Sequence, residues 1–146
     1  MAGYVDDNLL PGEQVVFRTS LHPIIFLSSA AVVVAGLVLG IVQTPLAGLS
    51  VLAAGLVLLL LNWIRQWSSE FAVTNRRVII KTGWLSRRTI ELNMSKVESV
   101  EVEQGLVARM LNYGTITVIG TGGTREPFAL IADPLGFRRA VQSQQS

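Results

Sequence analysis

The sequence predicts an α+β membrane protein, in which a transmembrane α-helical hairpin is followed by an antiparallel β domain that ends in a capping helix. Three observations lead to this fold class. Half of the 146 residues are hydrophobic, and the 46 residues between Arg18 and Arg65 contain no Asp, Glu, Lys or Arg. After Arg65, apolar and polar residues alternate with a period of two, as in half-buried strands. The C-terminal residues return to a helical pattern.

The charge-free block is long enough to cross a bilayer twice, because about 20 apolar residues span the hydrocarbon core. We expect spans at residues 23–42 and 46–64, joined by a short turn at 43–45. One alternative is a buried hairpin in a soluble protein, although a chain of this length has little protein with which to cover two such helices. A signal peptide is a weaker interpretation, because the leader is not basic and a second span follows at once.

A hairpin places both of its ends on the same side of the membrane. Residues 65–146 carry 11 Lys and Arg against 7 Asp and Glu, whereas the turn between the spans carries no charge. The positive-inside rule therefore predicts that both termini are cytoplasmic. Trp63 and Trp67 lie where the second span should leave the bilayer, as interfacial aromatic residues do. The expected organisation is a tether at residues 1–22, a hairpin at 23–64 and a cytoplasmic domain at 65–146.

Small residues recur along both spans and predict close helix packing. Gly36 and Gly40 form a GxxxG pair in the first span, and Gly48 and Gly55 lie in the second. Glycine lets two helices approach closely where lipid supplies no hydrophobic drive for association. Two uses of these positions are open: packing of the hairpin on itself, which we favour, or a face for another copy or another membrane protein.

Six short runs after the hairpin have the pattern of strands in an antiparallel sheet system, with turn residues between them. Within the runs, apolar residues such as Ile90 and Leu92 alternate with polar neighbours. The runs are residues 71–75, 76–82, 87–93, 96–104, 114–120 and 127–133.

Two helical segments are expected among these strands, one at residues 105–112 and one at the C-terminus. The first pairs apolar residues four positions apart, such as Leu106 with Met110, and ends at Asn112, which tolerates the left-handed conformation of a helix terminator. The second starts at Asp133, a favourable N-cap that is followed by proline at the first helical position. This helix is expected to close the domain.

Several blocks of the β domain resemble a known family. They are "FAVTNRRVIIKTGWLSR" (71–87), "KVESVEVEQG" (96–105), "RMLNYGTITVIGTGG" (109–123) and "DPLGFRRAV" (133–141). In this order they resemble the bacterial pleckstrin-homology-like (PH) domain of membrane proteins, catalogued as a domain of unknown function. Asn112 stands where that family commonly has glycine.

The resemblance implies a partly open, seven-stranded β-barrel or sandwich with a C-terminal capping helix, preceded by two spans in a bacterial inner membrane. Only six runs follow the spans in this sequence, so one strand is still to be placed. We expect it near residues 14–18, or by division of one of the runs.

The residue types needed for catalysis or metal binding do not gather in any recognisable pattern. The single histidine, His22, stands at the edge of the first span, and the chain has no cysteine. A nucleophile needs a base within reach, and no such set is evident. Glu98, Glu101 and Glu103 share one strand, where a solvated face explains them better than a metal site. We therefore expect no enzymatic activity, no metal and no cofactor.

The glycine cluster in "TVIGTGGTREPF" (117–128) at first suggests a phosphate-binding loop. Gly120 and Gly122 match the first two positions of a dinucleotide fingerprint, but Arg125 occupies the third and a further strand follows. Gly122 and Gly123 instead suit the tip of a β-hairpin, where positive φ is required. No nucleotide is expected. Nor is nucleic acid, because the net charge is only +2.

Basic residues concentrate near the second span and in the first part of the domain, together with an aromatic residue, Trp84. They are Arg65, Arg76, Arg77, Lys81, Arg87 and Arg88. Anionic lipid attracts such groups near a membrane surface, so they are candidates for headgroup contact. A solvated sheet face is the alternative. Two placements of Trp84 are left open as well: in the membrane interface, or packed against the end of the barrel.

The function expected from the sequence is that of a non-catalytic, membrane-anchored PH-like module for protein–protein interaction or assembly. Its partners would be the bilayer together with other copies of the chain, a larger membrane complex, or both. The alternative is a module that binds anionic lipid headgroups at the inner leaflet.

Overall fold

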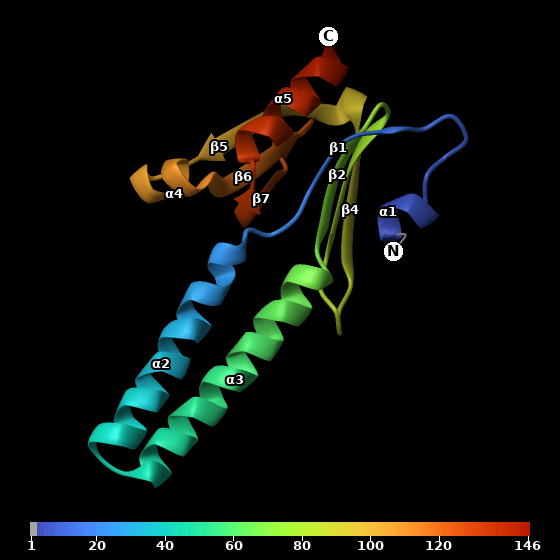
Figure 1. Cartoon of the computed structure of the whole chain (residues 1–146). Coiled ribbons are helices and arrows are strands. Elements are labelled where there is room, and N and C mark those ends of the chain that lie inside the picture. Colours follow the sequence, from blue (N-terminus) through green and yellow to red (C-terminus); the bar gives the residue numbers. More distant parts are fainter. Residues whose placement is uncertain (1–2) are drawn as a thin grey trace. The chain divides into compact units, whose positions relative to one another are not determined.

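The computed structural model describes residues 3–146, which divide into two compact units. One unit combines the residues up to His22 with Ser68–Ser146, and the other is Pro23–Trp67. The first unit is therefore made of two stretches of chain that flank the second. Figure 1 shows the elements of both units.

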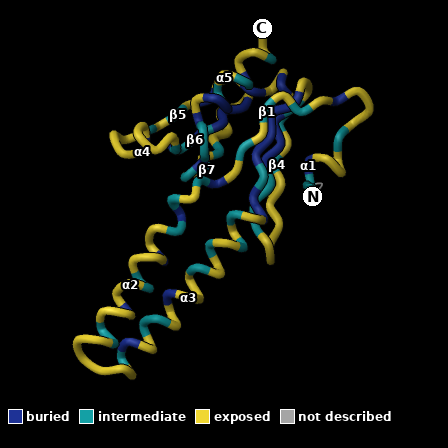
Figure 2. The backbone as a smooth tube through the Cα atoms, viewed as in Figure 1, coloured by how far each residue is buried: buried dark blue, intermediate teal, exposed yellow. Residues whose placement is uncertain are grey.

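The unit Pro23–Trp67 is a helical hairpin. A 3-10 turn, η1 (Pro23–Ile25), leads into α2 (Phe26–Val42), and α3 (Pro45–Trp67) returns antiparallel to it (Figure 1). Both helices are long and apolar enough to cross a membrane, and most of their residues are exposed in Figure 2. The second helix continues three residues past the expected end at 64, because Arg65 and Gln66 are good helix formers and end the apolar run without ending the helix.

The glycines of the hairpin lie where its two helices come closest. A Cβ atom added to Gly48 would lie 2.2 Å from the Cα of Gly40, and one added to Gly36 would lie 2.6 Å from the backbone nitrogen of Leu52. A Cβ at Gly55 would likewise meet Val33 at 2.7 Å. These distances are shorter than any real Cβ contact, so the helix approach requires glycine. In the structure these three glycines pack within the hairpin itself, which is the favoured of the two uses.

The other unit contains seven strands in two antiparallel sheets (Figure 1). The first sheet has the order β1 (Val15–Thr19), β2 (Glu70–Thr74), β3 (Arg77–Thr82), β4 (Arg88–Asn93). The second has the order β5 (Val97–Glu103), β6 (Tyr113–Gly120), β7 (Arg125–Ala132). The strand still to be placed after the sequence analysis is β1, near residues 14–18 as expected. Residues 1–22, expected as a tether, thus contribute an edge strand that pairs with β2.

The two sheets meet at a corner and, over residues 3–146, do not close into a barrel. An isolated bridge between Leu21 and Ile131 joins the end of β1 to β7. The N–H of His22 donates to the carbonyl of Leu130 at 2.7 Å next to this bridge. On the other side, β4 and β5 belong to different sheets, because the 3-10 turn η2 (Met94–Lys96) separates them. Of the partly open barrel or sandwich that the resemblance implied, the described residues show two antiparallel sheets and no closed barrel.

The C-terminal helix α5 (Pro134–Gln145) packs on both sheets, as expected of a capping helix. Phe137 and Val141 are fully buried, and the ring of Phe137 meets that of Phe17 edge-on at 6.4 Å. The Asp133 side chain accepts a hydrogen bond from the N–H of Gly136 at 3.2 Å, which confirms the predicted N-cap. The helix thus fills the core between the sheets.

The central strands β2 and β3 are buried on both faces. One face is covered by α5 and the second sheet, and the other by the short helix α1 (Tyr4–Asp7). Val5 of α1 forms a cluster with Ala72 and Ile79, all of them fully buried. This explains why residues 71–74 and 78–80 are buried without alternation. N-terminal residues are thus part of the core.

A buried ion pair joins the N-terminal residues to the first sheet. The Glu13 side chain is fully buried and accepts hydrogen bonds from Nε of Arg77 at 2.9 Å and from the Thr74 hydroxyl at 2.7 Å. A third bond comes from the N–H of Leu10 at 2.8 Å. Burial alone raises the pKa of Glu13, but these bonds outweigh it and lower the pKa from 4.5 to about 2. Arg77 also pairs with Glu91 on β4.

We expect Glu13→Gln to destabilise the domain by about 3 kcal/mol, because it removes the buried partner of the Arg77 guanidinium and leaves only the partly exposed Glu91 to balance its charge. The apparent melting temperature, measured by circular dichroism of the full chain in mild detergent, should fall by roughly 10 °C or more. Glu91→Gln is the matched control, with an expected loss under about 1 kcal/mol because Glu91 is partly exposed. Equal losses in both variants would show that the buried Glu13–Arg77 pair contributes no more to stability than the Glu91–Arg77 pair.

The same carboxylate makes stability depend on acid pH. Because the pKa of Glu13 is lower in the folded chain, its contribution is complete above about pH 4.5 and is lost as the pH falls toward about 2. The wild type should therefore lose more melting temperature than Glu13→Gln between roughly pH 5 and pH 3. Parallel curves for the two proteins would contradict the assignment.

Gly48→Ala should loosen the hairpin, whereas Gly40→Ala should be tolerated. A Cβ at Gly40 would make only an ordinary 3.5 Å contact with the Cα of Gly48, in contrast to the clash at Gly48 itself. Overpacking of this kind destabilises by about 1–3 kcal/mol. Unfolding of the helices in mixtures of mild detergent and SDS measures the difference. Similar behaviour of both variants would mean that the close approach does not exist.

Candidate functional site

Both connections between the two units leave the β-sheet unit at one end of its first sheet. Thr19 pairs with Phe71, so the strand before the hairpin and the strand after it end side by side. The chain runs from β1 through residues 20–22 into η1, and from α3 through two buried serines, Ser68 and Ser69, into β2. We call this end of the first sheet, where residues 20–22 and 68–69 leave it, the junction end.

His22 is part of the structure at this end. Its ring lies 5.2 Å from the ring of Tyr113, the first residue of β6, at a tilt of 32°. Its backbone bonds to β7, as described above. The histidine therefore helps to fix the corner between the sheets, beside the first residue of the hairpin. This position agrees with a structural role.

The carboxylates of Asp6, Glu98, Glu101 and Glu103 are all exposed, and two of them form ion pairs with arginine. Asp6 forms an ion pair with Arg18 at 2.6 Å, and the hydrogen bonds from Arg18 and from the N–H of Gly3 lower its pKa to about 2. Glu101 lies 3.5 Å from Arg125, while Glu98 and Glu103 are exposed along β5. Among the residues that the structure describes, no three metal-ligating side chains come together.

The six basic residues do not form a single group. Arg76 is exposed in the turn between β2 and β3, at the end of the first sheet away from the junction, and Arg77 is bound to Glu13 and Glu91. Arg65 lies in the last turn of α3. Arg76 and Arg77 therefore contribute nothing to a basic surface at the junction end.

The remaining three basic residues lie at the junction end. The Lys81 ammonium stands 5.5 Å over the ring of Tyr4, and Arg88 pairs with Glu126 of β7 at 2.8 Å. Arg87 is exposed in the loop between β3 and β4. This loop, residues 83–87, also carries Trp84, 60% exposed, and Leu85, 90% exposed. Trp84 thus does not pack against the end of the sheets.

The glycine cluster forms the predicted hairpin tip. Gly122 and Gly123 have φ values of 92° and 78° between β6 and β7. The N–H of Gly123 donates to the carbonyl of Gly120 at 3.1 Å. A Cβ at either of the two tip glycines would meet nothing within 4 Å, so positive φ alone requires glycine there. A strand follows, as expected, and the geometry of a phosphate-binding helix N-terminus is missing at this turn.

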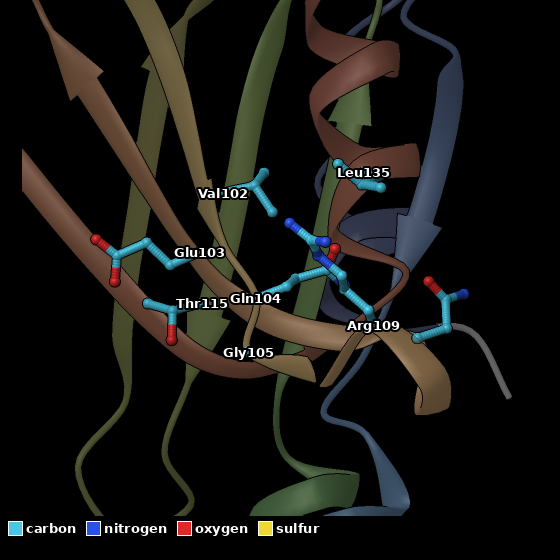
Figure 3. Close-up of a pocket in the computed structure, with 8 residues that line it drawn as sticks. Val102, Glu103, Gln104, Gly105, Arg109, Thr115 and Leu135 are labelled. Carbon is cyan, nitrogen blue, oxygen red and sulfur yellow. The ribbon is translucent and has the colours of Figure 1, made fainter. Parts of the chain in front are cut away.

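The segment between β5 and β6 forms a short helix, α4 (Leu106–Leu111), with unusual exposure. It ends at Asn112, whose φ of 58° confirms the predicted left-handed terminator. Leu106 and Met110 are 81% and 84% exposed, and only Ala108 is buried. An open hollow of about 930 Å³ adjoins this helix. Figure 3 shows Arg109 in its centre, with Glu103 and Thr115 on one side and Leu135 on the other.

Trp63 and Trp67 are both on α3 and are 64% and 68% exposed. A shallow apolar hollow lies on the hairpin between Phe26, Leu60 and Trp63. The sequence identified these tryptophans and Trp84, but it did not single out Leu85, and it paired Leu106 with Met110 only as a helical pattern. The available signal for α4 was its length: a helix of six residues between Gly105 and Asn112 has little room for a buried face.

The comparisons with known proteins bear on the fold. The family model of the bacterial PH domain matches residues 22–145. No curated protein and no solved structure matches the chain significantly. PH-type domains are generally non-catalytic interaction modules, which fits the scattered carboxylates and the structural histidine described above. The chain belongs to the bacterial PH domain family.

Proposed function

We propose that this protein is a non-catalytic, membrane-anchored interaction module. The hairpin Pro23–Trp67 crosses the inner membrane of a bacterium, and the PH-type domain is held at the cytoplasmic surface. The observation that carries the proposal is the junction: two long apolar helices are inserted between adjacent strands of one small domain. A domain tied in this way stays within a few residues of the bilayer.

The partners are proteins, either another copy of the chain or a larger membrane complex. The two open sheets leave β4 and β5 as edges that do not pair with each other, and an edge strand can accept a further strand from a partner. Charged side chains along β5, among them Glu98 and Glu103, limit the segments that fit there. The hairpin glycines are already used within the hairpin, so assembly is assigned to the domain.

Purification from membranes in mild detergent, followed by mass measurement, should give a particle larger than one chain. Replacement of both Glu98 and Glu103 by Lys should weaken that assembly roughly tenfold. A partner that fits the acidic edge of β5 would then meet the opposite charge there. Gln142→Lys, on an exposed face of α5, is the control. A strictly monomeric wild type without a co-purifying protein would overturn the proposal.

Binding of anionic lipid headgroups is a second candidate, and the loop 83–87 favours it. This loop combines exposed Arg87 with exposed Trp84 and Leu85, while Lys81 and Arg88 lie on the strands that it joins. Arg76 and Arg77 do not belong to this candidate, because they lie near the other end of the sheet.

Arg87→Glu should weaken binding of the domain to anionic vesicles by roughly tenfold or more. Each basic residue near the surface contributes about 1 kcal/mol of binding free energy, and this substitution changes the charge by two units. The protein for this measurement is the domain without the hairpin, in which a short linker joins residues 3–22 to 68–146. Residues 3–22 are needed because they supply β1 and the buried partner of Arg77, Glu13. Arg76→Glu makes the same charge change at the other end and should have little effect. Equal effects of the two variants, or binding that ignores lipid charge, would exclude the site.

A further inference from the structure

The apolar face of α4 is exposed, although hydrogen bonds and one buried residue connect the helix to the domain. The N–H of Arg109 donates to the carbonyl of Gly105 at 3.0 Å, and the Gln104 side chain donates to the carbonyl of Tyr113 at 2.8 Å. Buried Ala108 anchors the helix to the domain. The exposed side chains are Leu106, Val107, Met110 and Leu111. A fixed cluster of exposed apolar side chains marks a surface that meets another apolar phase.

The position of α4 indicates which apolar phase this is. Tyr113, directly after the helix terminator, packs on His22, the residue immediately before the apolar hairpin. The loop 83–87 joins β3 and β4 at the same end of the first sheet as the start of β2, as the pairing of Glu70 with Lys81 shows. The two exposed apolar segments of the domain therefore both stand at the junction end.

The charges of these two segments suit a membrane surface. The loop 83–87 and the segment 105–112 together contain two arginines, Arg87 and Arg109, and no acidic residue. Trp84 adds an aromatic side chain of the type enriched at membrane–water interfaces. Apolar side chains flanked by arginine are typical of helices that lie in the headgroup region, and anionic lipid attracts the arginines.

We propose that α4 lies in the headgroup–acyl boundary of the membrane that the hairpin crosses. Together with Trp84 and Leu85, it forms a two-point contact that fixes the orientation of the domain against the bilayer. The inference rests on the proposed membrane crossing, and it adds a lipid-inserting role for Leu106 and Met110.

The chain has no cysteine, so single cysteines can carry a fluorescent label without other changes. The full chain is reconstituted into vesicles of phosphatidylcholine and phosphatidylglycerol, with labels at Leu106→Cys, Met110→Cys or, as the control on α5, Gln142→Cys. Lipids with a nitroxide below the headgroup should quench both α4 labels by roughly half or more, because inserted helices lie about 5–10 Å deep. The label at residue 142 should keep its emission. Equal, weak quenching at all three positions would overturn the proposal, as would protection of α4 only in the presence of a co-purified protein.

A second measurement separates orientation from insertion. Leu106→Asp with Met110→Asp removes the apolar face, and the exposure of both residues predicts an unchanged melting temperature. A label at Leu85→Cys should then lose about half of its quenching, because the other contact point no longer holds the domain down. Unchanged quenching at residue 85 would refute the two-point contact.

A third label tests separately whether the hairpin crosses the membrane. Thr44→Cys lies in the turn of the hairpin and should be reached by a membrane-impermeant reagent only from the side opposite to Gln142→Cys. Labelling of both from the same side would overturn the proposed function. Labelling from opposite sides, with unquenched α4, would overturn the α4 proposal alone.

Discussion

The pairing of β1 with β2 is the constraint on which the rest of the molecule depends. These strands are neighbours in the sheet but are separated in the chain by the whole hairpin, Pro23–Trp67. Neighbouring strands lie about 4.8 Å apart, and packed helices lie about 8–10 Å apart. The first and last residues of a helical hairpin are therefore close enough together to continue from two neighbouring strands. An insertion whose ends are adjacent can be made without disturbing the sheet.

This pairing has an energetic consequence for the residues before the hairpin. They supply β1, the helix that covers the outer face of β3, and the buried carboxylate of Glu13. The Arg77 guanidinium, only 11% exposed, is balanced by that carboxylate and by the partly exposed Glu91. The domain is therefore complete only when the chain on both sides of the hairpin is present, and the hairpin is bound to a folded domain at both ends.

Much of the fold follows from local patterns in the sequence. Turn glycines, the Asp133 cap and the left-handed Asn112 each have a local physical cause, and all three are present in the structure. The continuous burial of residues 78–80 depends instead on α1, which is distant in the sequence and has a weak pattern of its own. The role of Arg77 was missed for a similar reason: one arginine in a basic run looks like its neighbours until Glu13 is placed beside it.

The exposed helix α4 shows why sequence alone places the fold better than the site. A pair such as Leu106 and Met110 predicts a helix with an apolar face, but the period does not say whether that face meets protein, lipid or water. In a core helix, apolar faces are covered by neighbouring elements, whereas here the short loop leaves only Ala108 against the domain. The location of this face supports its interpretation. Tyr113, which follows α4 directly after Asn112, packs on His22, the last residue before the apolar hairpin. The same four side chains at the tip of the β6–β7 hairpin, far from that point, would favour a protein partner instead.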